Sequence, residues 1–91
     1  MLKLKDNVDL KELEKFGFLY SDYYDAYVRT MNLQLYSVTI RVFVDNPNYK
    51  KGEVTAESSV WYDLIFSDDR MSFLNKDLIQ AGLVEKVKND N

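Results

Sequence analysis

The 91-residue chain contains no cysteine and no histidine. These two absences exclude disulfides, thiol nucleophiles, zinc sites built from cysteine and histidine, and acid–base catalysis by imidazole. Carboxylates, lysine, tyrosine, serine and threonine are the side chains left for chemistry. We therefore expect no cofactor, no bound metal and no catalytic residue, and we predict that the protein is not an enzyme.

Proline occurs once and glycine three times, which argues against long disordered segments. No apolar run approaches the ~18 residues of a membrane span, so no membrane association is expected. The first residues lack the pattern of a signal peptide, which predicts an intracellular protein. The net charge of −3 disfavours nucleic acid as a partner, because such binding depends largely on neutralising phosphates. The length favours one domain.

A short helix is predicted at residues 10–16. Asp9 is placed to cap its first turn, and Glu12 stands three residues later, as in an acidic variant of the capping box. Gly17 follows the last turn, where a left-handed residue commonly ends a helix. Phe18 then lies where it can contact Leu13. A strand is predicted before this helix, at residues 2–5, where leucine and lysine alternate.

A second amphipathic helix is predicted between residues 67 and 82. Ser67 or Asp68 can cap it, and Gly82 suits its end, with Leu83 packing back on Leu78. A short strand at 83–87 and a frayed tail at 88–91 follow.

The stretch LYSDYYDAYV contains four tyrosines in eight residues and has two interpretations. A helix at 20–27 would start immediately after another helix has ended. A strand at 23–30 fits the β-branched and aromatic residues better, and it can form a hairpin with the clearer strand at 35–44 through a turn near 31–34. We favour the strand.

Alternation along these strands predicts which side chains face the core. In 35–44 the apolar set comprises Tyr36, Val38, Ile40, Val42 and Val44. The opposite, bare face of the sheet is predicted to carry Tyr23, Tyr27, Arg29, Arg41 and Phe43.

Turn-forming residues between 45 and 53 predict an exposed loop. Within it, Tyr49, Lys50 and Lys51 combine an aromatic ring with two positive charges. Strand character returns at 60–66, with a helix as the alternative. The predicted order is β-α-β-β-β-α-β, a single small α+β domain with a mostly antiparallel sheet and two helices on one face.

Two acidic pairs, Asp22 with Asp25 and Asp68 with Asp69, could in principle hold Mg²⁺ or divide acid and base roles. Turn and helix-start positions explain them better. Tyrosine is common at recognition surfaces. The partner-binding residues are therefore predicted to be Tyr23, Tyr27, Arg29, Arg41, Tyr49, Lys50 and Lys51.

Two segments also resemble known proteins. LKLKDNVDLKELEKFGF at 2–18 and DLIQAGLVEKV at 77–87 are similar to small uncharacterised proteins encoded by phages and prophages of low-GC Gram-positive bacteria. The resemblance covers about a third of the chain and transfers no site residue. It implies a bacterial cytoplasm and an accessory role.

Three functions follow as hypotheses. The first is a non-enzymatic module that binds a protein partner or a second copy of itself. The second is a phage counter-defence inhibitor of a host nucleic-acid enzyme, because a small acidic protein can occupy a basic cleft. The third, disfavoured by charge, is a nucleic-acid binder that uses Tyr49, Lys50 and Lys51 with Arg29 and Arg41.

Overall fold

The computed structural model describes residues 1–60 and 67–87. These residues form six antiparallel strands, one 3₁₀ helix and two short α-helices, which confirms the α+β class. The strands are β1 (Leu2–Leu4), β2 (Leu19–Ser21), β3 (Ala26–Asn32), β4 (Ser37–Phe43), β5 (Glu53–Ser58) and β6 (Val84–Lys86). The helices are η1 (Leu10–Phe16), α1 (Asp68–Leu74) and α2 (Lys76–Gln80). The predicted strand at 60–66 and the predicted tail at 88–91 lie outside the described residues, except for Val60.

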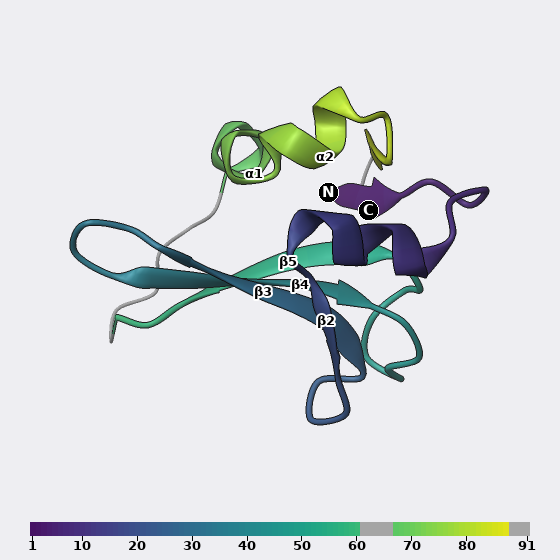
Figure 1. Cartoon of the computed structure of the whole chain (residues 1–91), viewed down its shortest axis with the longest axis horizontal. Helices are drawn as coiled ribbons and strands as arrows, with labels where there is room; N and C mark the ends of the chain where they lie inside the picture. Colours follow the sequence, from purple (N-terminus) through teal and green to yellow (C-terminus); the bar gives the residue numbers. More distant parts are fainter. Residues whose placement is uncertain (61–66, 88–91) are drawn as a thin grey trace.

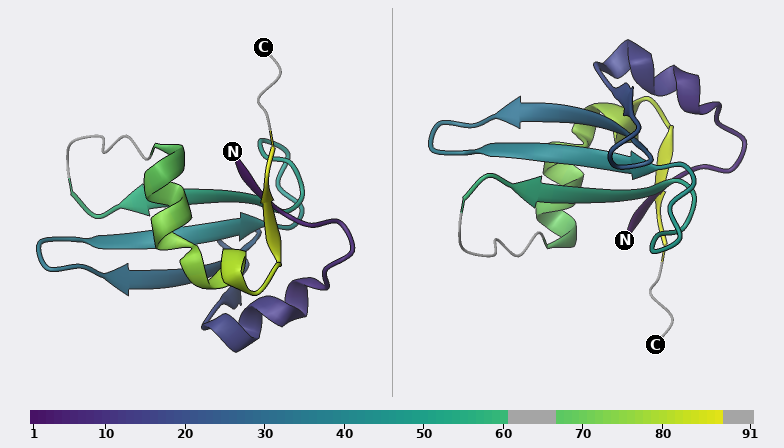
Figure 2. Two further views of the ribbon diagram at one scale, coloured as in Figure 1. Left: turned by 90° about the horizontal axis from the view of Figure 1, so that it is seen from above. Right: turned by 90° about the horizontal axis from the view of Figure 1, so that it is seen from below.

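The sheet has the strand order β2-β3-β4-β5-β1-β6, so the first strand of the chain lies between the fifth and the sixth. Figure 1 shows the helices gathered on one side of the sheet. Figure 2 shows α1 crossing over β3, β4 and β5, while β6 runs crosswise to these three strands. The sheet therefore coils, as right-handed strand twist accumulates across it, and no helix of residues 1–60 and 67–87 lies on its opposite face.

Helix η1 begins and ends as predicted. The Asp9 side chain accepts a hydrogen bond from the Lys11 N–H, and Gly17 has φ 86°. The reciprocal capping-box bond, donated by the Asp9 N–H to the Glu12 carboxylate, is absent within the described residues, and this carboxylate pairs with Lys15 at 2.9 Å. The Phe18 N–H donates to the Leu13 carbonyl at 3.2 Å, which closes the helix end.

The single helix predicted between 67 and 82 is wrong: two helices meet at Asn75. The Ser67 cap is confirmed by its bond from the Arg70 N–H, and the Leu83 N–H donates to the Leu78 carbonyl at 3.0 Å. Asn75 is fully buried, and its side-chain amide donates to the Met71 carbonyl at 2.9 Å. An asparagine that bonds its own main chain offers an alternative to the helical pattern, and the helix breaks there.

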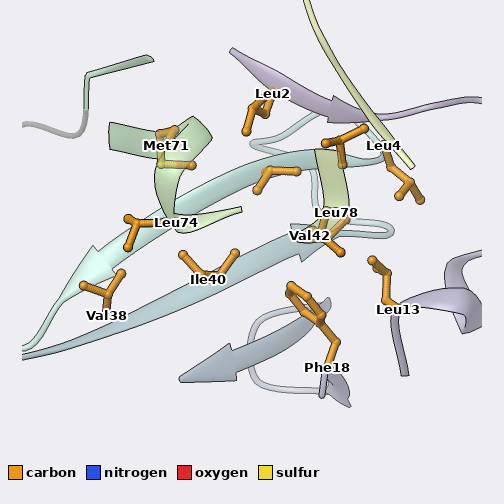
Figure 3. Packing of buried hydrophobic residues seen from close by; sticks show 12 residues of the cluster. Leu2, Leu4, Leu13, Phe18, Val38, Ile40, Val42, Met71, Leu74 and Leu78 are labelled. Carbon is orange, nitrogen blue, oxygen red and sulfur yellow. The ribbon is translucent and has the colours of Figure 1, made fainter. Parts of the chain in front are cut away.

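The hydrophobic core fills the space between the helices and the sheet (Figure 3). It includes the predicted Val38, Ile40 and Val42 of β4. The remaining buried members of the cluster are Leu2, Leu4, Leu13, Phe18, Val54, Met71, Leu74, Leu78 and Val84. Every described helix and four of the six strands supply its buried members, and Tyr27 and Met31 of β3 pack against them.

The predicted strand at 23–30 is displaced in the structure. β3 begins at Ala26 and extends to Asn32, and it forms a second hairpin with the unpredicted strand β2 through the loop at 22–25. The hairpin between β3 and β4 is confirmed, with Asn32 opposite Ser37.

The predicted face of β3 is wrong. Tyr27 lies opposite Val42 and Arg29 opposite Ile40. Directly opposite residues share a face of the sheet, so both side chains point toward the core and the helices. Arg41 does lie on the bare face. The physical reason is that the Arg29 guanidinium finds polar partners beneath the helices, while the Tyr27 ring packs against the core.

Candidate functional site

The tyrosine-rich stretch forms a tight hairpin at one end of the sheet. Ser21 pairs with Ala26 across a four-residue loop, in which Asp25 adopts a left-handed conformation with φ 53°. Aspartate tolerates this conformation better than most residues. The Val44 N–H donates to the Asp25 carbonyl at 3.0 Å, and this bond holds the hairpin against the end of β4.

Three apolar side chains of this hairpin are exposed and define what we call the docking edge. Leu19 is 69% exposed, Tyr20 is 49% exposed and Tyr23 is 87% exposed. Leu19 and Tyr20 belong to β2, the outermost strand, and in the described part of the chain no further strand pairs with its outer edge. Such an edge offers free main-chain groups beside exposed apolar area.

The other edge of the sheet differs in chemistry. β6 carries exposed Glu85 and Lys86, and charged side chains are a common means of preventing edge-to-edge association. β2 has no charged residue between Leu19 and Ser21. The two edges are therefore not equivalent, and β2 is the one suited to pairing.

Ring contacts fix the orientation of the tyrosines at the docking edge. The rings of Tyr20 and Tyr27 meet edge to face with centroids 5.6 Å apart, and those of Tyr23 and Tyr24 do so at 4.8 Å. Both are favourable geometries for aromatic pairs. The exposed rings are thus supported by half-buried neighbours, which reduces the entropy lost when a partner packs on them.

Three carboxylates lie near Tyr20 at the docking edge. Partial burial raises the pKa of Tyr20, and the carboxylates of Asp25, Asp22 and Asp45 raise it further. Asp22 and Asp45 are exposed. A positively charged partner would meet these carboxylates as it approaches the exposed rings.

Arg41 and Tyr49 belong to a cluster on the bare face, which reaches the docking edge through Tyr24 beneath Tyr23. The Tyr49 ring stacks on Phe43 at 3.9 Å and covers it, so Phe43 is buried although it faces away from the core. The Arg41 guanidinium lies 5.4 Å from the ring centroids of both Tyr24 and Phe43. It also donates to Thr55 at 3.1 Å. These residues hold the two loops at this end of the sheet.

Arg29 joins the sheet to the helices. Its guanidinium donates to the two carboxylate oxygens of Asp77 in α2 at 2.6 and 2.8 Å, and to the Phe16 carbonyl of η1 at 3.0 Å. Its side chain is 12% exposed and lies 4.5 Å from the centroid of the Phe18 ring. The hydrogen bond from Arg29 lowers the pKa of Asp77. Because both terminal nitrogens of its guanidinium bond to groups of the helices, Arg29 is not part of the docking edge.

The predicted residues are therefore not one site. Tyr23 is at the docking edge, where it is joined by Leu19 and Tyr20, which the sequence analysis missed. Lys50 and Lys51 line a pocket elsewhere, formed with β1 and the start of η1. The acidic, turn-forming residues after Ser21 were the available indication of a hairpin there. β2 itself has only three residues, which are too few to show the alternation typical of a strand.

No cluster of three or more carboxylates that could hold a metal ion occurs within residues 1–60 and 67–87. No helix in these same two ranges is long and apolar enough to cross a membrane. The chain matches no protein-family model, no curated protein and no solved structure.

Proposed function

We propose that this chain is a non-enzymatic protein-binding module whose docking edge receives an extended segment of a partner protein. The observation that carries the proposal is the outer edge of β2, which combines exposed Leu19 and Tyr20 with unpaired main chain in the described residues. A partner segment would add to the sheet as a further strand.

The two faces of β2 offer contacts of different kinds to such a segment. Leu19 lies opposite Val28 on the bare face, and Tyr20 lies opposite Tyr27 on the helix face. Side chains of an added strand alternate between the same two faces, so its apolar residues would meet Leu19 on one side and Tyr20 on the other. Main-chain bonds provide affinity, and these contacts provide selectivity.

The carboxylates around the edge favour a partner with basic residues. Asp22, Asp25 and Asp45 would attract lysine or arginine flanking the docked segment. A second copy of this chain carries the same acidic surround and the same net charge of −3, which disfavours pairing of two identical edges. We therefore assign the edge to a different protein.

A displayed library of extended peptides tests this proposal. Enriched peptides should alternate apolar residues and carry lysine or arginine. Leu19→Lys and Tyr20→Ser should each weaken their binding about tenfold or more, because each removes an apolar contact and the lysine also repels basic residues. Phe73→Ser, at an exposed apolar side chain of α1, is the matched control and should leave binding unchanged.

Hydrogen exchange at Leu19–Ser21 supplies the second readout. A docked strand protects main-chain amides, so exchange there should slow when peptide is bound. Binding that survives both β2 substitutions, or that leaves this exchange unchanged, contradicts the proposal. A concentration-dependent dimer abolished by Leu19→Lys would instead identify a second copy as the occupant.

Inhibition of a host nucleic-acid enzyme is the second candidate function. The acidic residues at the docking edge support it, because clefts that bind nucleic acid are basic. The resemblance of residues 2–18 and 77–87 to phage proteins supports a host enzyme as the target. Assays against a panel of bacterial nucleases should show inhibition that weakens at raised salt and in Asp22→Asn/Asp45→Asn. A panel without inhibition removes this candidate.

A further inference from the structure

A pocket of about 540 Å³ lies away from the docking edge. It is formed by β1, the turn after it, the first residue of η1 and the loop before β5. Four lysines line it: Lys3, Lys5, Lys50 and Lys51. Pockets that hold small molecules range from ~300 to ~1,000 Å³, so the size is appropriate for a small ligand.

Main-chain contacts bring these lysines together from distant parts of the sequence. The Leu4 N–H donates to the Gly52 carbonyl at 2.8 Å, and Lys3 lies opposite Glu53 in the β1–β5 ladder. Gly52 has φ 84°, and a Cβ atom there would lie 3.3 Å from the Leu4 Cβ. The loop that carries Lys50 and Lys51 thus lies so close to β1 that a larger residue at position 52 would crowd Leu4.

Positive charge in the pocket is only partly neutralised. Lys3 pairs with Asp6 at 3.0 Å, and Asp9 is engaged as the cap of η1. Lys5, Lys50 and Lys51 form no ion pair with any carboxylate of residues 1–60 and 67–87. Four lysines face two aspartates here, in a chain whose net charge is −3. Like charges collected against the overall charge of the protein favour an anionic ligand.

Apolar side chains complete the lining. Leu4 is buried, while Val8 and Leu10 are half-buried and pack against the core. These side chains offer surface to an apolar or aromatic part of a ligand, and the lysines offer point charges suited to phosphate oxygens. A ligand that uses both features needs an anionic end and an apolar body.

We infer that this pocket binds an organic phosphate, meaning a phosphate or diphosphate group carried on an apolar or aromatic body. The lysines hold the phosphate, and Val8 and Leu10 contact the body. None of the docking-edge residues lines this pocket, so the inference is independent of the proposed function.

Titration of the intact protein with phosphate compounds tests the inference. The probes are inorganic phosphate, adenosine, AMP and ADP, followed by calorimetry and amide chemical shifts at low salt. AMP and ADP should bind about tenfold or more tightly than inorganic phosphate, and adenosine should not bind detectably, because both features of the pocket are required. Shifts should concentrate at Lys5, Val8 and Lys51.

Charge-matched double variants separate the pocket from general electrostatics. Lys5→Gln/Lys51→Gln should weaken ADP binding about tenfold or more. Lys76→Gln/Lys86→Gln removes the same charge at exposed positions outside the pocket and should leave affinity within about twofold. Circular dichroism confirms that both variants are folded.

Each remaining outcome overturns the inference. If ADP does not bind, the pocket is not a phosphate site. If both double variants lose ADP affinity equally, the attraction comes from the overall charge of the protein and not from this pocket. Adenosine binding as well as ADP would indicate an apolar site only. Oligothymidylate of about ten nucleotides that binds more tightly than ADP, with a steep salt dependence, would identify single-stranded nucleic acid as the ligand.

Discussion

Replacing Arg29 with methionine tests how the helices are held on the sheet. Methionine removes the cation but keeps an unbranched side chain that still fills space beside Phe18. The variant loses the two bonds to Asp77 and the donations to the carbonyls of Phe16 and Leu74. One side chain therefore connects β3 to all three described helices.

The expected cost follows from the exposure of each partner. A hydrogen bond from a charged donor contributes ~1.5–3 kcal/mol when it is well formed. We take about 1.5 kcal/mol for the Phe16 carbonyl and about 0.5 for the longer 3.4 Å bond to Leu74. The Asp77 side chain is 44% exposed, so its pair is screened and contributes about 1 kcal/mol. Arg29→Met should then destabilise the fold by roughly 3 kcal/mol.

Urea unfolding followed by far-ultraviolet circular dichroism measures this cost. With an m-value of ~1 kcal/mol/M for a small domain, the midpoint should fall by about 3 M. Asp77→Asn keeps the cation and its carbonyl bonds, so it should lower the free energy of unfolding by only about 1 kcal/mol. Equal costs for the two variants, or a cost below about 1 kcal/mol for Arg29→Met, would refute the assignment of Arg29 as the connection between layers.

Two further perturbations test local features. Gly52→Ala should lower the free energy of unfolding, measured in urea, by about 2 kcal/mol, because the new Cβ crowds Leu4 in addition to straining a positive φ. Gly17→Ala, at φ 86° with open space around it, should lower it by only about 1 kcal/mol. Equal losses in the two variants would mean that Leu4 moves aside freely. The pKa of Asp77 in the folded protein is lowered from 3.8, so its contribution is present above that pH and lost as pH falls through the lowered value. The urea midpoint should therefore fall less steeply below about pH 4 in Asp77→Asn than in the parent chain, and identical slopes would contradict this linkage.

The sequence predicts those features that depend on neighbouring residues. The cap at Asp9, the left-handed end at Gly17 and the close of α2 at Gly82 follow from interactions within one turn of helix. The alternation of Val38, Ile40 and Val42 likewise determines the buried face of β4 without reference to distant parts of the chain.

Features that depend on distant partners were not predictable from one sequence. Arg29 and Asp77 are 48 positions apart, and their pairing decides that an arginine lies on the core face of β3. Asn75 breaks the predicted helix through a side-chain bond that competes with the helical pattern. The lysine pocket depends on the pairing of β1 with β5, so the sequence alone did not indicate that Lys3 and Lys51 lie near each other.

The place of β1 between β5 and β6 has a consequence for the order in which the chain folds. The meander from β2 to β5 joins only sequence neighbours, so it can assemble while later residues are still being synthesised. β1 is made first, yet its second neighbour is not complete until Lys86 has been added. β1 therefore waits in an unfinished sheet until β6 is available, and closure of the core is a late step in which these two strands pair.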